Sequence, residues 1–216
     1  MVSAPQPVTG TTPGQQPSRF PGFDVLAQAE RWDLVTAGVV LARLSLPAPL
    51  RFFTLAEEAV ARPLLDHLLD QHEDPRVPVL EMIDIRLTDQ QTDGWRYADL
   101  PEDGTAWRDS LAAVDDDARR RFDASFADCS RDQQAMLVQV VQDTGEQPWH
   151  QMRADRVWSL WTRYACTAFY AHPWAWNEIG FSGPAYPRGY KNRGLDKREP
   201  YEVADQQPVD PTRVSS

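Results

Sequence analysis

Apolar side chains recur three and four residues apart along most of the chain, and this spacing predicts helices. The pattern is plainest in the stretch that begins at Val79, where Ile83 and Leu87 fall on the same face. No Asn-Gly or Asp-Gly turn joins two alternating runs, so the usual signals of a β-hairpin are missing. We therefore expect an all-α fold, a small helical bundle with extended N-terminal and C-terminal arms. Its helices are expected at about 54–71, 79–90, 105–122, 130–145 and 153–170.

Two short motifs predict where helices begin. Thr54 and Glu57 have the spacing of a capping box, and so do Ser130 and Gln133. In such a box, the two side chains satisfy backbone N–H groups of the first helical turn. Pro63 lies inside the first predicted helix and has no N–H to donate, so it is expected to kink or divide that helix.

The predicted helix at 153–170 is the most apolar of the set. Trp161 and Tyr164 lie on its main apolar face, and Trp158 widens that face around the cylinder. A helix with so narrow a polar stripe is enclosed on most sides. An aromatic stripe at this spacing is typical of a core or an interface, which we favour over a ligand pocket.

Composition separates the two chain ends from a single central domain. Residues 1–19 are rich in Pro, Gly, Gln, Ser and Thr, a composition that cannot offset the entropy of ordering, so they are expected to be disordered. Residues 20–46 are apolar without one clean period, which indicates an arm with a short helix. We expect one helical domain over 20–200 and a flexible tail over 201–216.

Aromatic residues alternate with Gly and Pro in the segment HPWAWNEIGFSGPAYPRGY, residues 172–190. Gly and Pro disfavour a regular helix or a central strand, and the segment carries more aromatic area than it can bury alone. Trp and Tyr are enriched where two proteins meet. We therefore predict that 172–200 is an arm that binds a partner protein. The predicted partner-binding residues are Trp174, Trp176, Asn177, Glu178, Phe181, Gly183, Pro184, Tyr186, Pro187, Arg188, Gly189 and Tyr190.

The charge of the chain argues against two classes of partner. The formal net charge is −10, which opposes the phosphate contacts of nucleic-acid binding and would repel an anionic membrane surface. The C-terminal tail differs from this acidic body, because Arg188, Lys191, Arg193, Lys197 and Arg198 all lie there. These basic residues are expected to meet acidic surface on a partner.

The sequence lacks the motifs of the common cofactor and hydrolase classes, namely GxGxxG, GxxxxGK[ST], HExxH and GxSxG. His67 and His72 are five residues apart and do not share a helical face, so we expect no metal there. Cys129 and Cys166 are not in a CxxC motif, and we expect free, buried thiols. We predict no catalytic, cofactor-binding or metal-binding residue in this chain.

Residues 168–190 (AFYAHPWAWNEIGFSGPAYPRGY) resemble the C-terminal signature of the gluconate 2-dehydrogenase subunit 3 family, and the likeness extends over roughly 20–200. The resemblance implies a small accessory subunit paired with a large FAD-dependent subunit of the glucose-methanol-choline (GMC) type. Such a partner oxidises sugars, sugar acids or glycosides, and catalysis and FAD belong to it. Many relatives begin with a twin-arginine signal, whereas this chain begins with a polar, Pro-rich segment, so a cytoplasmic hetero-oligomer is expected.

Two other functions stay open on the sequence alone. A helical enzyme or ligand-binding protein could act by itself through a Trp-rich pocket with His150, His172 and Glu178. In that case His172 and His150 would have to be drawn together from the two ends of the aromatic helix; the simpler expectation for His172 is a residue at that helix's C-terminus. The chain could also be an assembly chaperone that leaves once the flavoprotein has folded.

Overall fold

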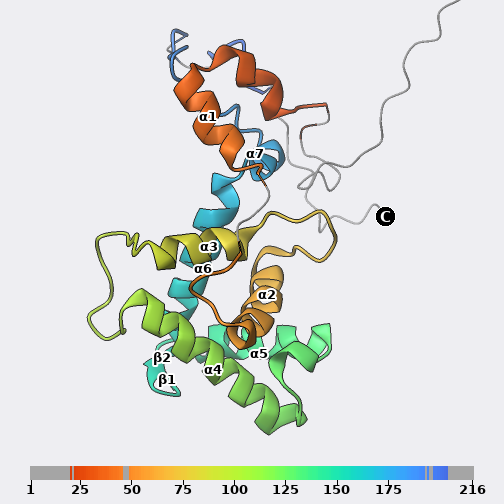
Figure 1. The fold of residues 1–216 in the computed structure, drawn as a ribbon, viewed down its shortest axis with the longest axis vertical. Coiled ribbons are helices and arrows are strands. Elements are labelled where there is room, and N and C mark those ends of the chain that lie inside the picture. The colour runs from red at the N-terminus through yellow and green to blue at the C-terminus, as the bar shows by residue number, and fades with distance from the viewer. Residues whose placement is uncertain (1–19, 21, 46–48, 193, 195–196, 204–216) are drawn as a thin grey trace, which may run out of the picture. The chain divides into compact units, whose positions relative to one another are not determined.

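The computed structural model describes residues 20, 22–45, 49–192, 194 and 197–203, which fold into helices and one short hairpin (Figure 1). The predicted disordered segment 1–19 and most of the predicted tail 201–216 lie outside the described residues. The elements are η1 (Val25–Arg31), α1 (Leu34–Ala42), α2 (Leu55–Leu69), α3 (Val79–Thr88), α4 (Asp103–Phe122), η2 (Phe126–Asp128), α5 (Arg131–Thr144), β1 (Pro148–Trp149), β2 (Met152–Arg153), α6 (Ala154–Ala171) and α7 (Pro173–Ile179).

The all-α prediction is confirmed, with one addition. β1 and β2 pair antiparallel, with Trp149 opposite Met152. No turn signal was recognised here, because the tight turn contains His150, which has a left-handed backbone with φ of 51°. Non-glycine residues are uncommon in this conformation, so the hairpin could not be predicted from glycine or asparagine alone.

Both predicted capping boxes are present. The Thr54 N–H donates to Glu57 Oε2 at 2.7 Å, and the Glu57 N–H donates to Thr54 Oγ1 at 3.3 Å. Ser130 and Gln133 make the same reciprocal bonds at the start of α5. Of the two predicted effects of Pro63, division of the first helix is wrong, because α2 runs unbroken through it. Buried side chains on both sides of Pro63 outweigh the one lost hydrogen bond.

The described residues group into two compact units. Unit 1 takes its residues from Met1–Ser45, Pro75–Val77 and Tyr170–Ser216, and unit 2 from Leu46–Asp74 and Pro78–Phe169. The prediction of a single domain over 20–200 stays a prediction. Among the described residues, no helix is both long and apolar enough to cross a bilayer.

An aromatic core holds unit 2 together. Trp107, Trp161 and Tyr164 are fully buried, and the Trp107 ring meets the Tyr164 ring edge-on at 5.9 Å. The indole N–H of Trp161 donates to Ser110 Oγ at 2.9 Å, so its polar atom is satisfied inside the core. The expectation that the aromatic helix is enclosed is therefore confirmed, and its rings serve the core.

A buried carboxylate fixes the chain just before α2. Asp84 on α3 is 1% exposed, and it accepts backbone N–H groups from Arg51 at 2.8 Å and from Phe52 and Phe53 at 2.9 Å. A buried polar group that is fully hydrogen-bonded orders the chain around it. Asp84 thus sets the position from which Thr54 begins α2.

Unit 1 has a small core of its own. Val25 of η1, Val40 of α1, Trp176 of α7 and the buried Trp32 form one apolar cluster. Asn177 ties two of these elements together, because its Oδ1 accepts the backbone N–H of Val25 at 2.7 Å. Val40 and Trp176 therefore share one core in unit 1 although they lie 136 residues apart in the sequence.

Candidate functional site

The segment predicted to be an irregular arm begins with a helix, α7, in unit 1. Pro173 occupies the first helical turn, and Gly180 ends the helix with φ of 67°. His172 directly follows the last residue of α6, where it was predicted, and is also the N-cap of α7, because its Nδ1 accepts the Trp174 N–H at 3.3 Å. Proline is favoured at a helix start and glycine just past a helix end, so the residues expected to exclude a helix instead delimit one.

Three of the predicted partner-binding residues are buried in the interior of unit 1. Trp176 is 5% exposed, and its indole N–H donates to the Tyr170 carbonyl at 2.7 Å. Asn177 is buried, and its side chain accepts a hydrogen bond from η1. Gly183 is buried with φ of 75°, and a Cβ built there would lie 2.5 Å from the ring of Trp32. These residues shape the segment from within.

Arg188 fastens the chain that follows α7. Its guanidinium donates to the carbonyls of Ser182 at 3.2 Å and Pro184 at 3.0 Å, and to Gln28 Oε1 at 3.0 Å. The same group lies 3.8 Å from the centre of the Tyr201 ring. These contacts hold the segment against η1, so the backbone that carries its exposed side chains has a defined position.

The remaining predicted residues leave aromatic area open to solvent. Phe181 is 41% exposed, Tyr186 is 69% exposed and Tyr190 is 53% exposed. Trp174 is half-buried, with its ring edge-on to His172 at 4.6 Å. The other members are half-buried or exposed: Glu178, Pro184, Pro187 and Gly189. The role of the twelve residues in partner binding stays a prediction.

Exposed apolar side chains that the sequence prediction did not include lie on α1, also in unit 1. Leu34 is 92% exposed, Val35 is 77% exposed and Val39 is 55% exposed. The sequence of α1, LVTAGVVLA, was the signal that could have identified this surface, because it is almost wholly apolar. The helix fully buries only Val40. A helix that is apolar all round yet exposed on one side is unusual for an isolated protein.

His172 is a buried ionisable group of unit 1. It is 1% exposed, and burial lowers its pKa from 6.5 to about 4; a hydrogen bond with the Arg43 backbone opposes this shift, and the positive charge of Arg43 adds to it. Arg43 is held in place by a bond from its Nη1 to the Ala171 carbonyl at 2.6 Å. His172 is therefore neutral near pH 7 and serves as a cap.

We expect acid to destabilise the fold through His172. In the unfolded chain its pKa is near 6.5, so below that pH the unfolded state binds a proton that the folded state does not. The stabilisation is complete above pH 6.5 and is lost as the pH falls toward 4, by at most about 1.4 kcal/mol per pH unit. Urea denaturation of the native chain and His172→Asn between pH 4 and 7 measures this, since asparagine also caps helices. A stability difference that is independent of pH would contradict it.

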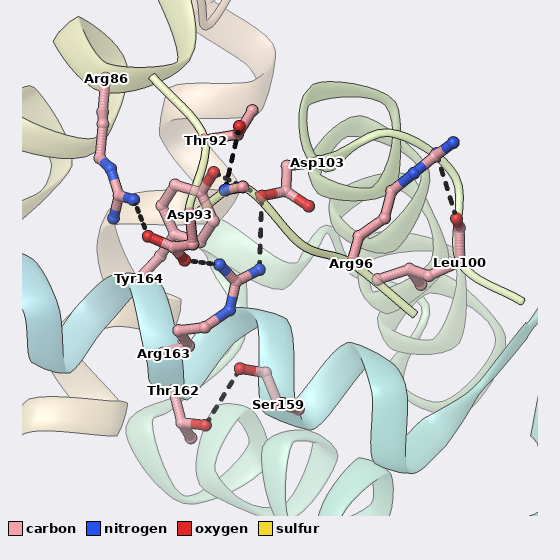
Figure 2. Close-up of polar contacts among 11 residues, drawn as sticks. Arg86, Thr92, Asp93, Arg96, Leu100, Asp103, Ser159, Thr162, Arg163 and Tyr164 are labelled. Atoms are coloured by element: carbon pink, nitrogen blue, oxygen red, sulfur yellow. Dashed lines mark hydrogen bonds and ion pairs between the residues drawn. The ribbon is translucent and has the colours of Figure 1, made fainter. Parts of the chain in front are cut away.

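A polar cluster in unit 2 connects the loop after α3 to α6 (Figure 2). Asp93 forms ion pairs with Arg86 and Arg163. Asp103 Oδ2 accepts the Tyr164 hydroxyl at 2.7 Å and lies 3.3 Å from Arg163 Nη2. Burial, together with the bond and charge of Asp103, raises the pKa of Tyr164, so its hydroxyl stays protonated and donates.

The cluster borders a cleft of about 640 Å³ in unit 2, which Phe52, Trp95 and Arg108 also line. Both carboxylates of the cluster are paired with guanidinium groups, and Tyr164 is held as a donor. Such a network can fix a loop. The cluster is therefore a structural connection between the loop and α6.

The histidines proposed for a metal or catalytic alternative have other roles. His150 Nε2 lies 2.9 Å from Asp117 Oδ1 in unit 2, whereas His172 caps α7 in unit 1. The His67 and His72 rings are 5.3 Å apart, closer than predicted, because α2 ends at Leu69 and the chain turns back. Within the described part of the chain, no three His, Cys, Asp or Glu residues are grouped so that they could hold a metal ion.

Both cysteines are free, as predicted, but only one is buried. Cys129 lies in the interior, and burial raises the pKa of its thiol. Cys166 is exposed on α6, which corrects the prediction of two buried thiols.

Burial also raises the pKa of the Glu178 carboxyl in α7, so this group is less acidic than an exposed glutamate.

A family model described as gluconate 2-dehydrogenase subunit 3 matches residues 56–183. The match covers more than half of the 216 residues, from the first turn of α2 to Gly183 just after α7. Searches of the curated proteins and of the solved structures found no match. η1, α1 and the chain after Gly183 lie outside the matched range.

Proposed function

Because this chain belongs to the gluconate 2-dehydrogenase subunit 3 family, we propose that it is a non-catalytic small subunit of an oxidoreductase complex. Its partner is a large FAD-dependent subunit of the GMC type, which oxidises sugars, sugar acids or glycosides. The flavin and the reaction belong to that partner, and this chain binds and stabilises it. The complex is cytoplasmic.

The observation that carries the proposal is that unit 1 leaves apolar surface exposed in a chain that belongs to a family of subunits. Tyr186, Tyr190 and Phe181 expose large ring areas although Arg188 fastens the backbone beneath them. Rings on a fixed backbone lose little conformational entropy on binding, which makes them efficient anchors. A partner that covers these rings would remove their apolar area from water, which stabilises the complex by about 25 cal/mol for each Å² buried.

Charge supports a partner with an acidic rim. Lys191, Lys197 and Arg198 are exposed near the end of the described chain, while the whole chain carries a net charge of −10. A locally basic tail on an acidic protein is attracted to acidic surface and speeds association more than it raises affinity. The complex should therefore form more slowly as salt concentration rises.

Co-expression with a GMC-type flavoprotein from the same genome tests the proposal. We expect the two to co-elute on size exclusion with flavin absorbance in the shared peak. We also expect Tyr186→Ala with Tyr190→Ala to weaken the complex at least about 10-fold, the scale of an interface hot spot. Trp95→Ala is the control, because Trp95 is also an exposed ring, 52% exposed, but belongs to unit 2.

Two results would contradict the proposal. A native chain that is folded and monodisperse but never co-elutes with the flavoprotein would overturn the subunit role. Oxidation of a sugar by the isolated chain would favour the self-sufficient enzyme instead. A complex that forms and then dissociates once the flavoprotein has bound FAD would point to the assembly chaperone.

A further inference from the structure

The outer face of α1 is an apolar surface with no polar side chain. At 100° per residue, its members fall within one continuous sector of the helix. Val40 points to the opposite side, into the core cluster with Trp32 and Trp176. The members of this outer face, which are all exposed, are Leu34, Val35, Gly38, Val39, Leu41 and Ala42.

The described residues of unit 1 leave this face uncovered. Among the described residues, Leu34 and Val35 remain 92% and 77% exposed after every contact of the fold has been made. The two chain ends outside the described residues, 1–19 and 204–216, consist mostly of Pro, Gln, Ser, Thr and other small or polar residues. They contain too few large apolar side chains to cover a helix face.

A protein groove fits the face better than a lipid surface does. Helices that lie on membranes carry Lys and Arg beside their apolar face, whereas the sequence of α1, LVTAGVVLA, has no charged residue and the chain is strongly acidic. A Cβ built on Gly38 meets nothing within 4 Å, so another backbone can approach the centre of the face closely. Helix-in-groove docking uses this kind of rigid apolar face.

The anchoring of α1 makes it a preformed docking element. Asp33 caps its start, with Oδ1 accepting the Thr36 N–H at 2.8 Å. Val40 shares the core cluster with Trp176 of α7, so α1 and the start of the segment with exposed rings rest on the same packing. A partner that covers those rings therefore meets a unit whose α1 is already fixed, which lowers the entropic cost of docking.

We propose that the outer face of α1 inserts into an apolar groove of the large flavoprotein subunit. This inference rests on the proposed function, and it adds an interface that neither the family match at 56–183 nor the predicted C-terminal residues include. The flavoprotein is favoured over a second copy of this chain because the family is one of subunits in a larger complex.

Polar substitution of the face tests the inference against the native FAD-loaded flavoprotein. The α1 variant is Leu34→Gln with Val35→Gln and Val39→Gln. We expect it to bind the purified flavoprotein about 10- to 100-fold more weakly by titration calorimetry. The matched control changes three exposed apolar residues of unit 2, and we expect its affinity to stay within about 3-fold of the native chain. The control variant is Leu55→Gln with Ile85→Gln and Met136→Gln.

Hydrogen exchange on the native complex gives an independent measurement that needs no variant. We expect the amides of α1 to exchange more slowly when the flavoprotein is bound, because the covered helix opens less often. An α1 variant that keeps native helix content by circular dichroism and native affinity would overturn the inference, and so would unchanged exchange in α1. In both cases the proposed function would stand, because the native chain still binds.

Other occupants give distinct outcomes. A native chain that does not bind the flavoprotein at all overturns the proposed function, and this inference with it. If the chain alone sediments as a dimer that the α1 variant converts to a monomer, the face is a contact between copies and the inference fails. It also fails if the native chain, but not the α1 variant, co-sediments with phosphatidylglycerol vesicles.

Discussion

Replacing Asp84 by alanine is expected to lower the free energy of unfolding by about 3–5 kcal/mol, the scale at which loss of one partner disrupts a buried charged network. Asp84 is 1% exposed and satisfies the backbone N–H groups of Arg51, Phe52 and Phe53. Alanine leaves all three donors without their acceptor. It also leaves the start of α2 without its anchor.

Two matched variants separate this role from a general effect of charge. Asp84→Asn retains one acceptor oxygen, and we expect it to cost less, about 1–3 kcal/mol. Asp89→Ala removes the exposed partner of Arg51 in an ion pair of 3.2 Å, and should cost no more than about 1 kcal/mol. Urea denaturation followed by circular dichroism gives all three values. Equal losses for Asp84→Ala and Asp89→Ala would show that the backbone bonds matter little.

The second large effect is expected from Gly183→Ala in unit 1. The residue has φ of 75°, which strains alanine by about 1 kcal/mol, and the new Cβ would lie 2.5 Å from the Trp32 ring. Moving Trp32 disturbs the cluster it forms with Val25 and Trp176, which adds about 1–3 kcal/mol. The chain should therefore lose about 2–4 kcal/mol of stability in urea denaturation.

Gly189→Ala is the control for backbone strain. Gly189 also has positive φ, 66°, but a Cβ built there meets nothing within 4 Å. It should lose only the strain energy of about 1 kcal/mol. The difference between the two variants measures the packing of Gly183 against Trp32. If both variants lose the same stability, the close approach seen here does not constrain unit 1.

Helix starts in unit 2 were readable from the sequence because their signals are local. Thr54 with Glu57 and Ser130 with Gln133 form the capping boxes that their spacing predicts. The aromatic helix expected at 153–170 appears as α6, Ala154–Ala171. A side chain that bonds to the backbone three residues away needs no distant partner, so the sequence suffices.

The candidate surface was only partly predictable. The exposed rings of Tyr186 and Tyr190 lie where the sequence placed a partner-binding segment, and their exposure fits that expectation. Trp176 is an aromatic residue of the same segment, yet it is buried. Which ring turns inward depends on where η1 and α1 lie, and those segments come more than 130 residues earlier in the chain. The outer face of α1 was missed for the same reason, since an apolar run does not reveal which of its sides the core covers.

The sequence by itself determined the helical class, the capped helix starts, the free thiols and the family, because each depends on neighbouring residues or on a motif. Only the tertiary structure decided that His172 is buried, that Trp176 belongs to a core and that Leu34 and Val35 face outward. Burial is a property of packing between distant segments, and the energy of an apolar side chain depends on what covers it. The same nine apolar or small residues of α1 would specify a core helix in one fold and an exposed docking face in another.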